Sequence, residues 1–195
     1  MIPQCFYCHD CLRVAHFHMT KDLLMAQQLS HPNLLRLLGW CVRGEETVST
    51  LLQEHGMAAI LEYSQPLDRH LINSWTLGTR LQHTLEILDL LDYLDKSPVG
   101  SLMAPHLKLS NFQLVEGHIK LTDMEYFKVA TLKCTRHCPY GLQCMHGVCD
   151  GYSNRRNMMQ FKKVFGEIFF TKMDIGNVPE VQHIWLDANK IYIIK

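Results

Sequence analysis

The sequence lacks an excess of either charge. Its 195 residues carry 19 Lys and Arg against 19 Asp and Glu. Binding to nucleic acid or to an anionic membrane surface depends on net positive charge, so the overall balance gives no reason to expect either partner. No stretch approaches the roughly 18 apolar residues that a transmembrane helix needs, and we therefore expect no membrane span.

Two further absences concern residues 1–20. They contain no continuous apolar stretch of the kind found in a signal peptide, so we expect no signal peptide in this chain. They also contain no glycine, which excludes from this segment a glycine-rich loop that wraps phosphate groups with its backbone.

Cysteine, in contrast, is abundant, and seven of the eight cysteines fall into two clusters. An even count suggests disulfides in an oxidising compartment. Two interpretations stay open, because no signal peptide is visible: the chain is a fragment of a secreted precursor, or its cysteines are reduced or bind metal. The clusters are Cys5, Cys8 and Cys11, and then Cys134, Cys138, Cys144 and Cys149.

Both clusters could bind a zinc ion, because thiolates and imidazoles are the ligands that zinc prefers. The first cluster has His9, His16 and His18 nearby, but lacks a second pair across a longer loop; a zinc site and ordinary terminal sequence both remain open. The second cluster has x3, x5 and x4 spacings instead of the C-x-x-C pairs of zinc ribbons, which favours disulfides over zinc if the chain is luminal.

Hydrophobic periodicity predicts three helices. The first runs from Thr20, as N-cap, to Leu29. Residues Trp75 to Leu94 form the second, and Met158 to Phe170 the third. In the second helix, the residues expected to face the core are Leu77, Leu81, Leu85, Leu88 and Leu91. Short strands are predicted at Thr47 to Leu52 and at Ala58 to Tyr63.

The segment with the clearest chemistry runs from Ala104 to Asp123. It reads as a polar loop, a short strand, a turn at Glu116-Gly117 and a second short strand. Such a hairpin brings Asn111 close to Asp123, and amide and carboxylate oxygens are ligands for Mg²⁺. Lys108, on the same loop, could offset phosphate charge.

This segment resembles the protein-kinase catalytic loop, written H-R-D-L-x-x-x-N, followed by the metal-binding Asp of D-F-G. Leu107, Lys108 and Asn111 are in register with the loop, and Asp123 stands at the place of the D-F-G aspartate. His106 occupies the position of the catalytic aspartate. The resemblance implies that Asn111 and Asp123 bind Mg²⁺ and ATP, with His106 and Lys108 at the catalytic positions.

Other segments are similar to further parts of a kinase. Residues 31–41 resemble the connection from helix C to strand four, which puts Asp22 in the place of the helix C glutamate; we favour a simple helix-terminal charge for Asp22. Residues 61–64 resemble the hinge, so that the backbone of Glu62 and Tyr63 would meet adenine. Residues 14–17 faintly resemble the strand carrying the phosphate-pairing lysine, but Phe17 stands in its place.

Together with Ser74-Trp75, Arg80, residues 97–101 and the cysteine cluster that leads into Arg155-Arg156-Asn157, the pattern is similar to the secreted, Golgi-resident divergent protein kinases. The most similar family is vertebrate lonesome kinase, an extracellular protein-tyrosine kinase. The resemblance covers about Lys21 to Phe170 and implies secretion or a Golgi lumen location, with luminal disulfides among the second cysteine cluster.

The fold implied by the resemblance is α+β and protein-kinase-like. Residues 1–20 would form a Cys/His-rich N-terminal segment and 21–195 the kinase-like domain. Within it, 21–63 would be a truncated upper lobe and 64–195 a mainly helical lower lobe with a Cys-rich insertion at 134–149. Only about 20 residues precede the helix C candidate, so the chain is either a partial gene product or a remnant that has lost nucleotide-clamping parts.

Three functional hypotheses follow, from different classes. The first is ATP- and Mg²⁺-dependent phosphoryl transfer to protein tyrosine, with His106 as the proton acceptor because a neutral imidazole can act as a base. The second is a catalytically inactive pseudokinase or interaction module, which needs no cofactor. The third is a zinc-stabilised, cysteine-rich binding protein. The first two imply a protein substrate or partner; no feature indicates an oligomeric state.

Overall fold

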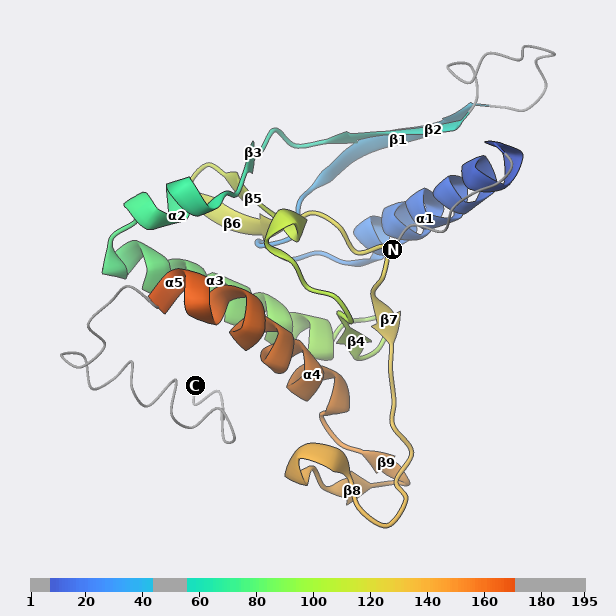
Figure 1. Cartoon of the computed structure of the whole chain (residues 1–195). Helices are drawn as coiled ribbons and strands as arrows, with labels where there is room; N and C mark the ends of the chain where they lie inside the picture. Colours follow the sequence, from blue (N-terminus) through green and yellow to red (C-terminus); the bar gives the residue numbers. More distant parts are fainter. Residues whose placement is uncertain (1–7, 44–55, 171–195) are drawn as a thin grey trace.

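The computed structural model describes residues 8–43 and 56–170. This part of the chain contains helices and small antiparallel sheets. Figure 1 shows α1 and the β1–β2 hairpin at one end, α3 beside α4 and α5 in the middle, and the β8–β9 hairpin at the other end. The expected α+β class is confirmed. None of the described helices is both long and apolar enough to cross a membrane. The helices are α1 (Cys8–Gln28), α2 (Arg69–Ser74), α3 (Leu77–Asp95), α4 (Tyr152–Phe161) and α5 (Glu167–Phe170), and the strands are β1 (Leu37–Arg43), β2 (Gly56–Leu61), β3 (Gln65–Pro66), β4 (Leu102–Met103), β5 (Phe112–Val115), β6 (His118–Leu121), β7 (Lys128–Val129), β8 (Cys144–Met145) and β9 (Val148–Cys149).

The first helix is longer than predicted. It begins at Cys8 and crosses the expected boundary after residue 20 without a break. Thr20 is therefore not an N-cap: its hydroxyl donates to the carbonyl of His16 one turn earlier, at 2.7 Å. The faint strand likeness at residues 14–17 was wrong for the same reason, since these residues are helical. Cys5 lies outside the described residues, as does the predicted strand Thr47 to Leu52.

The β5–β6 hairpin forms as the sequence predicted. Phe112 pairs with Leu121 and Val115 with His118. The turn residues Glu116 and Gly117 both have positive φ angles, 51° and 82°, which is the conformation of the tightest hairpin turns. The partner strand β3 completes a three-stranded sheet.

A second connection ties this hairpin to the segment before β1. The amide of Leu35 donates to the carbonyl of Leu121 at 2.9 Å, and the amide of Leu121 donates to the carbonyl of Asn33 at 2.8 Å. The buried side chain of Asn33 adds a bond to the carbonyl of Ile119 at 2.8 Å. The N-terminal part of the chain is thereby fastened to the strand that leads into Asp123.

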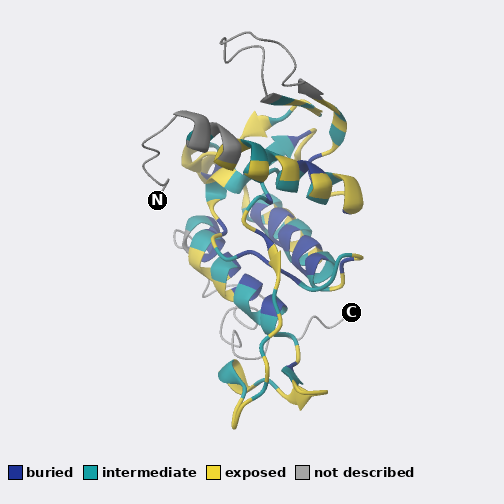
Figure 2. Ribbon diagram, turned by 90° about the vertical axis from the view of Figure 1, so that its right-hand side faces the viewer, coloured by how far each residue is buried: buried dark blue, intermediate teal, exposed yellow. Residues whose placement is uncertain are grey.

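The core lies between α3, the β5–β6 hairpin and the helical stretch from α4 to α5 (Figure 2). The predicted leucine face of α3 was partly wrong: Leu91 is buried, but Leu85 is 63% exposed. The buried face instead includes polar residues, which a search for leucine repeats does not detect. Its buried members are Arg80, His83, Thr84, Ile87, Leu90, Leu91 and Leu94.

The predicted helix from Met158 to Phe170 is confirmed, but it starts earlier and changes its pitch. It begins at Tyr152 and passes through a π-helical segment, Lys162–Gly166, before α5. Phe165 is fully buried and packs against three other rings, with centroids 5.0–5.6 Å away. This aromatic cluster joins the helical stretch to β5, and its rings are Phe112, Phe161, Phe165 and Phe169.

Two buried polar side chains form hydrogen bonds to backbone groups within the same core. The guanidinium of Arg80 donates to the carbonyl of Phe169 at 2.8 Å, which satisfies a carbonyl at the end of α5. The fully buried amide of Asn157 accepts from the backbone of Ala104 at 2.8 Å and donates to the carbonyl of Leu102 at 2.9 Å. Helix α4 is thus tied to the segment that precedes the catalytic-loop-like residues.

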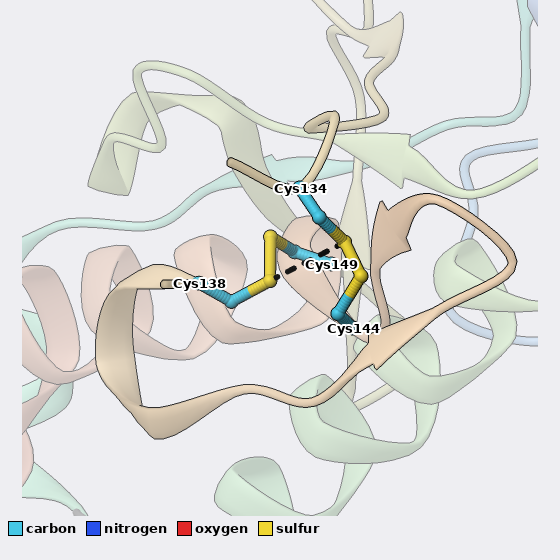
Figure 3. The surroundings of a disulfide bond; sticks show 4 residues. All are labelled: Cys134, Cys138, Cys144 and Cys149. Atoms are coloured by element: carbon cyan, nitrogen blue, oxygen red, sulfur yellow. Dashed lines mark hydrogen bonds between the residues drawn. A yellow bond between two sulfur atoms is a disulfide. The ribbon is translucent and has the colours of Figure 1, made fainter. Parts of the chain in front are cut away.

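The second cysteine cluster forms two disulfides, Cys134–Cys144 and Cys138–Cys149 (Figure 3). Disulfides were the expected chemistry of this cluster. The sulfur atoms of Cys134, Cys138 and Cys149 lie within 4.8 Å of one another, close enough for a shared metal ion. Each of them is nevertheless paired in a disulfide, which does not favour the zinc alternative.

Candidate functional site

The hairpin brings Asn111 and Asp123 into direct contact. The Asn111 amide donates from Nδ2 to Oδ2 of Asp123 at 3.1 Å. The second carboxylate oxygen, Oδ1, accepts from the amide of Glu125 at 3.0 Å. The backbone locks the arrangement, because the amide of Thr122 donates to the carbonyl of Asn111 at 2.8 Å. Both side chains are half-buried.

These two residues suit a magnesium ion by the chemistry of their donors. Asp123 supplies a carboxylate and Asn111 an amide oxygen, and each of these oxygens has a lone pair beyond its present hydrogen bond. One obstacle is visible: the Asn111 oxygen accepts from the amide of Lys108 at 2.8 Å, while its NH₂ group faces Asp123. Joint coordination therefore requires the amide of Asn111 to turn and to give up its bond to Asp123.

Asp22 belongs to the same site, which the interpretation as a helix-terminal charge did not foresee. It lies within α1, and its Oδ1 accepts from the amide of Met124, the residue after Asp123, at 2.9 Å. Burial raises the pKa of the Asp22 carboxyl; the Met124 amide opposes this rise, and the nearby charges of Asp123 and Glu125 add to it. The site therefore gathers negative charge, which favours a cation.

Glu125 and its neighbours extend the site in a way that the sequence did not indicate. Oε2 of Glu125 lies 3.7 Å from Nδ1 of His18, and the rings of His18 and Tyr126 are 5.4 Å apart. A hydrogen bond with Glu125 raises the pKa of the exposed Tyr126. Helix α1 supplies both His18 and Asp22, which are four residues apart and therefore lie on one face. The sequence did not predict this arrangement because it did not indicate that His18 and Asp22 belong to one helix.

His106 and Lys108 lie on the loop before Asn111, and both are exposed. The backbone of Lys108 meets Asn111 at both ends, since its amide donates to Oδ1 and its carbonyl accepts from the Asn111 amide at 3.1 Å. Among the described residues, the imidazole of His106 has no hydrogen-bond partner. No side chain in the described part of the chain therefore orients it.

Glu62 and Tyr63 are not brought to the Asn111–Asp123 pair by any contact in the described part of the chain. Oε1 of Glu62 accepts from Nζ of Lys120 at 2.7 Å and from the amide of Arg36 at 2.9 Å. Burial opposes ionisation of Glu62, but these two bonds outweigh it and lower its pKa. The side chain of Tyr63 is 85% exposed. Only their backbone groups are left for the adenine contact that the resemblance implies.

No family model matches this chain. The sequence is similar to a human protein described as extracellular tyrosine-protein kinase PKDCC, with 26% identity over 165 residues. The matched region covers 80% of this chain and 32% of the relative, so the chain spans about a third of the relative's length. The resemblance to the vertebrate lonesome kinase family, indicated by the motifs, is thereby confirmed as a similarity over four fifths of the chain.

Proposed function

We propose that this chain is a protein-kinase-like module of the secretory pathway that binds a magnesium nucleotide at Asn111 and Asp123. The observation that supports the proposal most directly is the contact between these two side chains at the end of the β5–β6 hairpin. A bound Mg²⁺ ion would neutralise phosphate charge there. The chain's own residues would hold the ion, and Lys108 would place a cation beside the phosphates.

In this proposal, residues 21–63 belong to an upper lobe, and the chain from residue 64 onward belongs to a lower lobe. Two contacts join these two parts next to the proposed site: Asp22 of α1 reaches the residue after Asp123, and the segment before β1 pairs with β6. The backbone of Glu62 and Tyr63 would meet the adenine edge. The two disulfides and the similarity to a protein described as extracellular support the secretory assignment.

Phosphoryl transfer to protein tyrosine is the finer proposal, because it is the activity in the name of the relative. His106 limits it. The imidazole is exposed and has no orienting partner among the described residues, whereas a general base must be held within hydrogen-bond reach of the proton it accepts. We expect nucleotide binding to be retained and phosphoryl transfer to be slow.

A second candidate function, an inactive pseudokinase that serves as an interaction module, is favoured by the same feature of His106. The two candidates are separated by turnover. His106→Asp should raise autophosphorylation or phosphorylation of a tyrosine-containing peptide mixture by at least about tenfold if the lost carboxylate is the defect. No gain in a variant that still binds nucleotide would favour the pseudokinase.

The binding proposal is tested with Asp123→Asn and Asn111→Ala in a titration with a fluorescent ATP analogue. We expect both variants to weaken Mg²⁺-dependent binding by about tenfold or more, which corresponds to about 1.4 kcal/mol. Asp150→Asn is the control, because Asp150 is exposed and lies outside the site. Equal affinity of Asp123→Asn and the control would remove Asp123 from the site.

A further inference from the structure

The even overall charge conceals a separation of charge along the chain. Between Lys128 and Lys163 the sequence has seven Lys and Arg residues and one acidic residue, Asp150. The remaining residues therefore carry 12 Lys and Arg against 18 Asp and Glu, because the chain as a whole carries 19 of each. A partner with a strong negative charge would thus be attracted to one region of this protein and repelled by the rest.

Six of the seven basic residues of this region come from two elements that touch, and the seventh, Lys128, lies on β7. One is the disulfide hairpin, residues 132–150, and the other is α4 with its π-helical continuation. Nη1 of Arg156, on α4, donates to the hydroxyl of Tyr140 on the hairpin at 3.3 Å. Figure 1 shows the hairpin projecting from the start of α4, at the end of the molecule opposite the β1–β2 sheet.

The disulfides fix the backbone of the hairpin that carries two of the charges. Lys133 precedes Cys134, and Arg136 lies between Cys134 and Cys138, whose partners are in β8 and β9. Lys133 also pairs with Val148 in an isolated bridge. Both basic side chains are exposed, as is Lys163 on the helical side. A surface whose backbone is already constrained loses less conformational entropy when a ligand binds.

Arg155 carries a donor that the described residues of the folded chain leave unsatisfied. Its Nε atom is buried, yet it has no hydrogen-bond partner within the described part of the protein. A buried donor without a partner costs about 1–3 kcal/mol. A surface oxyanion would reach Nε only if the side chain turned outward, and guanidinium groups bind such oxyanions with well-defined geometry.

We propose that the disulfide hairpin and α4 form a docking surface for a sulfated glycosaminoglycan chain. The charges extend along the length of α4 and onto the hairpin, which suits a linear polyanion better than a compact ligand. The disulfides and the extracellular description of the relative fit an environment where the abundant linear polyanions are sulfated polysaccharides. This surface is separate from Asn111 and Asp123 and does not depend on the proposed nucleotide binding.

The test is affinity chromatography of the oxidised protein on immobilised heparin, with elution by NaCl. We expect retention at 0.15 M salt, and a loss of affinity of about tenfold or more in the triple variant Lys133→Ser, Arg136→Ser, Lys163→Ser, because each ionic contact contributes through counterion release. The matched control is Arg36→Ser, Arg69→Ser, Lys96→Ser, which removes the same charge from exposed positions elsewhere. It should elute close to the wild type.

Three results would overturn the proposal. One is passage of the wild-type protein through the column at 0.15 M salt. Another is an equal shift of the test and control variants, which would reveal a general charge effect. The third is equal competition by desulfated heparin or polyglutamate, which would show that sulfate groups are not recognised. Thermal melts of both triple variants ensure that folded proteins are compared.

Discussion

Two carboxylates near β6 have pKa values that are shifted in opposite directions. Burial raises the pKa of Asp22, while hydrogen bonds from Lys120 and the Arg36 amide bring the pKa of Glu62 below its ordinary value in spite of burial. Ionised Asp22 therefore lowers the free energy of unfolding, and ionised Glu62 raises it. These opposite signs lead to separate predictions.

Glu62→Gln should lower stability by about 1–2 kcal/mol at pH 7, because it removes a hydrogen bond between charged groups while keeping an acceptor for Arg36. A depressed folded-state pKa gives stability that is present above the unfolded pKa and is lost as the pH falls through the folded value. The difference between wild type and variant should therefore shrink below about pH 4.5. Urea unfolding at several pH values measures it; a constant difference would contradict the assigned ion pair.

Asp22→Asn should have the opposite effect, because an amide oxygen can still accept from Met124 but carries no charge beside Asp123 and Glu125. A raised folded-state pKa makes the ionised wild type less stable above that pKa, and the penalty disappears in acid. We expect a gain of up to about 1 kcal/mol at pH 7 and none near pH 3. Asp22→Ala, which loses the acceptor, is the control and should be destabilised; a destabilised Asp22→Asn would refute this account.

At this scale, the sequence was informative where the chain is locally constrained. Asn111 and Asp123 meet because a two-residue turn sets the register of the hairpin. Asp22 was misjudged because its partner, Met124, lies about 100 residues away and no local pattern reports such a contact. The sequence did not identify Arg80 and Asn157 as core residues for a similar reason. Their carbonyl partners are far away along the chain and come within hydrogen-bond distance only when the chain folds.

At the scale of elements, the side chain of Asn157 joins α4 to β4 and to Ala104 through two buried hydrogen bonds. Asn157→Ala leaves the Ala104 amide and the Leu102 carbonyl without partners, and two buried polar groups together cost about 2–5 kcal/mol. Asn154→Ala is a matched control on the same helix, because the Asn154 amide only approaches Asp95 at 3.4 Å. We expect it to change stability by less than about 1 kcal/mol in chemical denaturation. Similar losses in both variants would deny Asn157 this role.

The two disulfides allow a second comparison between elements. Their sequence separations, 10 and 11, are nearly equal, so loop-closure entropy predicts about 3 kcal/mol for each. Cys149 is buried, whereas Cys144 is exposed. Replacing Cys138 and Cys149 by serine should therefore destabilise the hairpin more than replacing Cys134 and Cys144. Limited proteolysis within residues 134–150 measures this, and the reverse order would contradict it.

Element prediction succeeded for the long helices and failed at their ends. The apolar spacing after Trp75 located α3 to within two residues of Leu77. The start of α1 was missed by 12 residues, because His, Cys and Arg in its first turns gave no apolar face. The π-helical segment also follows no sequence rule that we used; it keeps Phe165 and Phe169 in the aromatic cluster.

At the scale of the whole molecule, the described residues place a proposed nucleotide site and a proposed polyanion surface in different regions. The first lies where α1 meets the end of β6, and the second lies at the disulfide hairpin and α4. Asn157 of α4 bonds to the segment before the catalytic-loop-like residues, but no described contact joins the basic side chains to Asn111 or Asp123. We therefore expect that nucleotide does not alter heparin affinity. A glycosaminoglycan could then hold this protein near its partners without occupying the proposed nucleotide site.

The measurement that tests the central claim most directly is a thermal-shift titration of the oxidised protein with ATP, with and without Mg²⁺. A ligand that binds only the folded state adds about 1.4 kcal/mol at ten times its Kd, which should raise the Tm by about 3–6 °C for a chain of this size. We expect this rise with Mg²⁺ and little change without it. A cooperative melt that stays unshifted at millimolar Mg²⁺-ATP would contradict the assignment of Asn111 and Asp123 to a nucleotide site.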